Sequence, residues 1–171
     1  MAPDEQGALS SANGGYREAW KDVYQVNLDS LFQLALLLTG DSQEAEANLT
    51  TVISGFDFSK QPGKDVLAVL QTAVAERSIG SAGASSSGGL AGARSMLQPG
   101  LLPVLHLERF PRVCFVLRMM LGYATSACAV MLGIEEGAVK RLLQVAVLQL
   151  HYSMHITEIK GRGPKGVLRR S

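Results

Sequence analysis

A stretch poor in large side chains, near the middle of the sequence, constrains this chain more than any other feature. Residues 80–100, GSAGASSSGGLAGARSMLQPG, consist mostly of Gly, Ser and Ala, which supply almost nothing that can pack into a core. This composition predicts a flexible linker between two separate segments. In a chain of 171 residues, each segment can bury only a modest core of its own.

Apolar residues on both sides of this linker recur at the spacing of α-helices. Hydrophobic residues make up 47% of the chain and aromatic residues only 6%, so burial depends on Leu, Val, Ala and Met, a composition that suits helices. We therefore expect an all-α protein. Its predicted parts are a disordered leader (1–15), a helical domain (16–79), the linker (80–100), a second helical domain (101–156) and a basic tail (157–171).

Two glycines predict where helices end. In the first segment, Thr39, Gly40 and Asp41 should stop one helix and cap the next, which runs from about residue 42 to 53. In the second segment, Gly133 should adopt a left-handed conformation between a helix over 125–132 and another that begins near Glu136. Two helices joined by so short a turn are typical of a helix-turn-helix.

Charge and cysteine content narrow the classes of function. The formal net charge is only +1, so the chain lacks the general positive field of most nucleic-acid-binding proteins, and any DNA-binding patch must be local. Cys114 and Cys128 lie in apolar segments without a CxxC partner, which predicts buried thiols rather than a zinc site or a disulfide.

The segment from residue 113 to 134 is long enough to cross a membrane and has Arg118 as its only charge before Glu135. However, Gly122 and Tyr123 predict a break between two short helices, and a central Arg is costly in lipid. The first sixteen residues contain acids and lack the apolar stretch of a secretory signal. These features favour a cytoplasmic protein with no membrane partner.

Two stretches resemble extracytoplasmic-function sigma factors, a group of the bacterial sigma-70 family. Residues 121–143, LGYATSACAVMLGIEEGAVKRLL, resemble the family's C-terminal promoter-reading domain, and residues 31–49, LFQLALLLTGDSQEAEANL, are similar to its polymerase-binding domain. The residues in register in the first stretch are Gly122, Ala129, Leu132, Gly133, Ile134, Glu136, Gly137, Ala138, Val139, Lys140 and Leu143. The resemblance implies a DNA-binding protein of transcription initiation or regulation that acts with RNA polymerase.

The resemblance also implies which side chains contact the partners. Promoter DNA would be contacted by Thr125, Lys140, Arg141 and Gln144. RNA polymerase core would be contacted by Glu44 and Glu46. Leu142, Val145 and Leu148 are predicted on other grounds to contact a protein partner, because apolar side chains that stay exposed on a helix favour a protein over DNA. An anti-sigma factor or a second copy of the chain is the further partner that such a protein would have.

The chain departs from the family pattern on the helix that would face DNA. At about 100° per residue, Val139 and Ala146 fall on an inner side, whereas Val145 and Leu148 fall on the outer side, where the family carries basic residues. We therefore expect weak binding to promoter DNA. The alternative is a degenerate sigma-like module that binds proteins and no longer binds promoter DNA. A third interpretation makes Val145 and Leu148 extra core, or part of a helix that packs on the first helical domain.

No set of residues in the sequence has the spacing of a catalytic site, so we expect no enzyme and no cofactor. His151 and His155 stand four residues apart, as two metal ligands on a helix would. No Cys or acid nearby completes such a site, and surface histidines are the simpler interpretation.

Overall fold

The computed structural model describes residues 27–57, 65–81 and 97–161, with side chains up to Ser153 in the last range. Every regular element within these ranges is helical, so the all-α expectation is confirmed for them. The predicted leader (1–15), most of the predicted linker and most of the basic tail lie outside the described residues.

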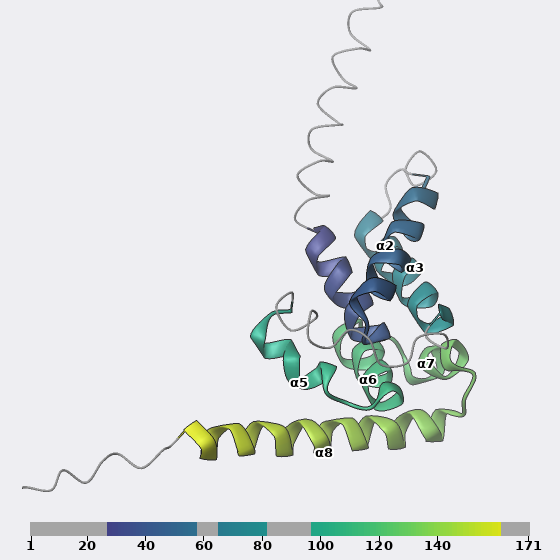
Figure 1. The fold of residues 1–171 in the computed structure, drawn as a ribbon. Helices are drawn as coiled ribbons and strands as arrows, with labels where there is room; N and C mark the ends of the chain where they lie inside the picture. The colour runs from purple at the N-terminus through teal and green to yellow at the C-terminus, as the bar shows by residue number, and fades with distance from the viewer. Residues whose placement is uncertain (1–26, 58–64, 82–96, 162–171) are drawn as a thin grey trace, which may run out of the picture.

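Figure 1 shows the helical elements of the described residues. They are a helix over residues 27–39, α2 (Ser42–Gly55), α3 (Val66–Ser81), the 3-10 turn η2 (Pro99–Leu101), α5 (Leu102–Leu105), α6 (Arg109–Phe115), the π-helical segment η3 (Val116–Met120), α7 (Thr125–Leu132) and α8 (Glu136–Gly161). Helices α2 and α3 pack on each other, and α8 packs against α6 and α7.

The junction before α2 forms as its sequence predicts. The Asp41 side chain accepts hydrogen bonds from the backbone N–H groups of Gln43 and Glu44, both at 2.9 Å, and so caps the helix. Gly40 takes a φ of 82°, which ends the preceding helix. Its N–H donates to the carbonyl of Leu36 at 2.8 Å, and the predicted stop and cap are therefore confirmed.

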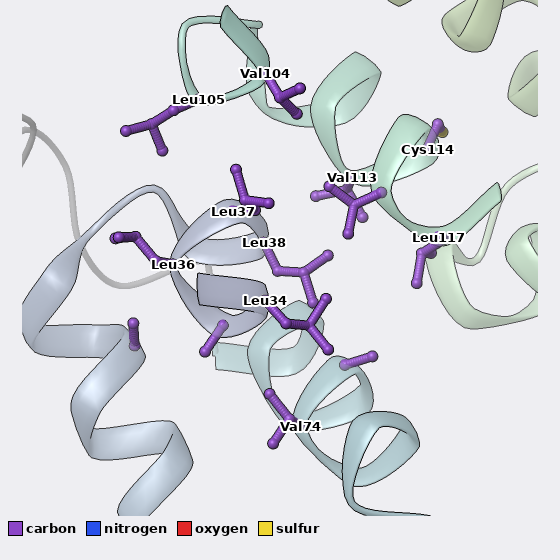
Figure 2. Close-up of a cluster of buried hydrophobic side chains, with 14 of the residues drawn as sticks. Leu34, Leu36, Leu37, Leu38, Val74, Val104, Leu105, Val113, Cys114 and Leu117 are labelled. Atoms are coloured by element: carbon purple, nitrogen blue, oxygen red, sulfur yellow. The ribbon is translucent and has the colours of Figure 1, made fainter. Parts of the chain in front are cut away.

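The two segments on either side of the predicted linker share one hydrophobic core (Figure 2). Leucines of the helix over 27–39 and Val74 of α3 lie against side chains of α5, α6 and η3. The residues of this cluster labelled in Figure 2 are Leu34, Leu36, Leu37, Leu38, Val74, Val104, Leu105, Val113, Cys114 and Leu117. The division into two domains stays a prediction, and the described parts of both segments pack on each other.

The membrane-length segment of the sequence is broken in the structure. The π-helical segment ends at Met120, Gly122 adopts a φ of 73°, and α7 begins only at Thr125. The predicted break is thus confirmed. Within the described ranges, no helix combines the length and the apolar character needed to cross a bilayer.

Candidate interaction surface on helix α8

The approach to α8 is a tight turn built around Gly133. This glycine has φ 64° and ψ 33°, the left-handed conformation, so its predicted positive φ is confirmed. The backbone N–H of Ile134 donates to the carbonyl of Ala129 at 3.1 Å, which satisfies a carbonyl at the end of α7. Half-buried Ile134, at the end of the turn, packs against the hydrophobic core.

One side of α8 is buried against the rest of the protein. Val139 and Ala146 are 1% and 0% exposed, as the helical periodicity predicts. Leu142 and Leu150 are partly buried and pack against the same core. Leu142, which the sequence suggested as a partner contact, is thus turned further inward than Val145 and Leu148.

The opposite side of α8 faces outward and combines polar and apolar residues. Lys140, Arg141 and Gln144 are exposed in the first half of the helix. Val145 and Leu148 follow them and are 41% and 57% exposed. The interpretation that places these two side chains in the core is therefore wrong.

Two exposed residues of α8 were missed by the sequence reasoning. Val147 is 48% and Tyr152 is 66% exposed. Tyr152 comes four residues after Leu148 and seven after Val145, so continuing the helical periodicity beyond residue 150 would have found it. We call Arg141, Val145, Leu148 and Tyr152, which share this side, the outer row of α8.

Two acids stand at the beginning of the same helix. Glu135 and Glu136 are exposed, and the carbonyl of Glu135 accepts the N–H groups of Ala138 and Val139 at 2.9 and 3.1 Å. Negative charge here favours the helix because it lies at the positive end of the helix dipole. The same charge repels phosphate, so a polyanion is favoured only from Lys140 onward.

The remaining residue predicted to contact DNA lies elsewhere. Thr125 is the first residue of α7 and is half-buried. Of the four predicted DNA contacts, only the three on α8 are therefore exposed together along one helix.

The acids predicted to contact the polymerase lie on α2, far from α8 (Figure 1). Glu46 is exposed, whereas Glu44 is half-buried in the first turn. The neighbouring Asn48 is buried, and its side chain donates a hydrogen bond to the Ser81 hydroxyl at 2.7 Å. Asn48 therefore holds α2 to the end of α3 and is not presented to a partner.

The two cysteines belong to the hydrophobic core. Cys114 and Cys128 are fully buried free thiols, and burial raises the pKa of both, that of Cys114 to about 11. Among the described residues, no group of three or more His, Cys, Asp or Glu side chains is placed to hold a metal ion.

Comparisons of the chain with protein-family models, with curated proteins and with solved structures found no match.

Proposed function

We propose that this protein is a sigma-factor-like regulator of transcription that binds duplex DNA weakly through the first half of α8. The observation that carries this proposal is the exposure of Lys140, Arg141 and Gln144 on the helix that follows the Gly133 turn. In a helix-turn-helix, the second helix lies in the major groove and its N-terminal residues reach the bases. The α7–turn–α8 unit would be used in this way.

The proposed binding is weak because few cations are available. In the first half of α8, Lys140 and Arg141 neutralise at most two phosphates, and Glu135 and Glu136 oppose phosphate at its first turn. Each phosphate contact contributes about one unit to the slope of log affinity against log salt concentration. Gln144 is able to pair with adenine, but one amide discriminates poorly between sequences.

The polymerase part of the proposal depends on the resemblance of residues 31–49 and on α2. Glu46 remains exposed on this helix and is available to a basic surface of RNA polymerase core. Because α2 and α8 lie at opposite ends of the molecule (Figure 1), one protein could hold polymerase and DNA at the same time.

A salt titration tests the DNA-binding proposal. Fluorescence anisotropy with labelled duplex DNA should give a log-log slope of roughly −2 to −4, including a contribution from the basic tail. Lys140→Ala with Arg141→Ala should make this slope shallower by about two units. Arg77→Ala, which removes an exposed cation from α3, is the matched control and should change neither slope nor affinity. Absence of binding, or an unchanged slope in the α8 double variant, would refute the proposal.

A second candidate function is a protein-interaction module that has lost promoter binding. The exposure of Val145, Val147 and Leu148 favours it, because apolar side chains that remain in water on one helix fit a protein surface better than a phosphate backbone. Purified core RNA polymerase distinguishes the two candidates. If the protein binds both core RNA polymerase and duplex DNA, the transcription regulator is supported. If it binds neither, the protein-interaction module is supported.

A further inference from the structure

Exposed apolar side chains on α8 form a row that begins at a cation. Val145, Leu148 and Tyr152 are 41%, 57% and 66% exposed, and Arg141 stands one turn before them. Residues four, three and four positions apart lie above one another on a helix. The outer row is thus a narrow strip with an arginine at one end and a tyrosine at the other.

The spacing of the outer row is the same in both directions. If the helix is turned end to end about the point midway between residues 146 and 147, position 141 takes the place of position 152. Position 145 likewise takes the place of position 148. A second α8 laid antiparallel on the first would therefore place Val145 against Leu148 twice. It would also place each Arg141 guanidinium beside a Tyr152 ring, a favourable cation–π pairing.

The reverse symmetry also disfavours a parallel arrangement. A parallel pair in the same register would bring Arg141 against Arg141 and Tyr152 against Tyr152. Like charges across a helix pair are destabilising, and the two apolar positions would gain no better contact. Charge and apolar complementarity together select the antiparallel orientation.

We propose that a second copy of this chain covers the outer row of α8, with the two helices antiparallel about a two-fold axis. Such an interface is isologous, because the same row serves both copies and closes the assembly at a dimer. Figure 1 shows α8 along one edge of the molecule, with α5, α6 and α7 on its other side. In the dimer, the other helices of each copy would then lie on opposite sides of the pair of α8 helices.

The dimer is weak because the row is narrow. Four side chains from each copy bury far less than the roughly 1,600 Å² of a standard interface. We therefore expect a dissociation constant of about 10 to 500 µM, so that monomer and dimer exchange readily.

Dimer formation has a consequence for DNA that depends on the proposed function. Arg141 belongs both to the outer row and to the basic part of α8, so one helix cannot serve a partner copy and a major groove at once. Self-association would then lower the fraction of protein that is able to bind DNA. The self-association itself does not depend on DNA binding and is measured without DNA.

Analytical ultracentrifugation of the full chain tests the dimer. The weight-average mass should rise from monomer toward dimer as the concentration increases through the micromolar range. Leu148→Glu should remain monomeric, because it places an unpaired charge in the centre of the pair. Val130→Glu is the matched control, since Val130 is 82% exposed on α7, outside the row, and it should dimerise as the parent does. Circular dichroism of both variants establishes that they are folded.

Disulfide trapping tests the orientation. We would mix the Val145→Cys and Leu148→Cys variants in equal amounts and oxidise them gently, with the buried native thiols unreactive. The antiparallel pair predicts the mixed disulfide between the two variants as the main product. A parent protein that stays monomeric at every concentration would overturn the dimer. Dimerisation of Leu148→Glu would show that the outer row of α8 is not the interface. A preference for the two homodisulfides would show that the helices are not antiparallel.

Discussion

The guanidinium of Arg112 donates a hydrogen bond to the carbonyl of Thr39 at 3.2 Å, across 73 positions of sequence. Its other terminal nitrogen donates to the carbonyls of Leu105 and Leu107 at 3.1 and 3.2 Å. Arg112 is buried, and desolvation, followed by repulsion from Arg109, lowers its pKa. The two terminal nitrogens are satisfied by three carbonyls, those of Thr39 and Leu105 at the last residues of two helices and that of Leu107 in the loop before α6.

This arrangement requires glycine at position 40. Gly40 has a φ of 82°, and a Cβ built on it would lie 2.6 Å from Nη2 of Arg112. Gly40→Ala should therefore lower the free energy of unfolding by more than about 1 kcal/mol, as urea denaturation would measure. Gly55→Ala is the matched control, because it lies in α2 with nothing within 4 Å, and it should be neutral or stabilising. Equal stability of both variants would contradict the role given to Arg112.

A second hydrogen bond joins the two segments near α7. The Tyr123 hydroxyl donates to the Thr72 hydroxyl of α3 at 2.8 Å. Tyr123→Phe and Thr72→Val should each cost about 0.5 to 1.5 kcal/mol, and the double variant should cost less than the sum because the two changes remove one interaction. A double-mutant cycle by urea denaturation measures this coupling. Strict additivity would mean that the contact contributes nothing.

The Gly133 turn makes a separate prediction about stability. Gly133 has a φ of 64°, and nothing lies within 4 Å of a Cβ placed there. Any cost of substitution therefore comes from the backbone conformation and not from a clash. Gly133→Val should destabilise the protein by more than about 1 kcal/mol in thermal or urea unfolding. Gly137→Ala, inside α8 with only ordinary contact to Arg141, should not, and a harmless Gly133→Val would contradict the left-handed turn.

Local sequence signals predicted the turns and the inner side of α8 correctly. The cap at Asp41, the left-handed Gly133 and the burial of Val139 all depend on residues close together in the chain. Such features follow from backbone sterics, capping chemistry and helical periodicity.

The contacts between the two segments could not be predicted in this way. Thr39 with Arg112 and Thr72 with Tyr123 depend on how helices pack in three dimensions, and no periodic pattern encodes that arrangement. Tyr152 is a different case, because it follows from the same periodicity as Val145 and Leu148 and is found only when that periodicity is continued beyond residue 150.

The buried thiols give the protein a defined response to alkaline pH. Burial first, and the proximity of Cys128 second, raise the pKa of Cys114 from 9.0 to about 11. Between these values the folded state holds a proton that the unfolded state has lost, so stability falls as pH rises. Urea midpoints should therefore decrease from about pH 8.5 to about pH 11, and less so in Cys114→Ala. Identical pH profiles of the two proteins would contradict the assignment to this thiol.

Two charges added on the outer side of α8 test most directly whether this helix faces outward and binds DNA. Val145→Arg with Leu148→Arg restores cations where the resemblance implies them, at positions that are 41% and 57% exposed. If α8 is presented to a major groove, fluorescence anisotropy should show tighter binding to duplex DNA and a log-log salt slope steeper by about two units, in a protein that remains folded. An unfolded double variant, or one whose DNA affinity and salt slope match those of the parent, would contradict an outward-facing α8 that binds DNA.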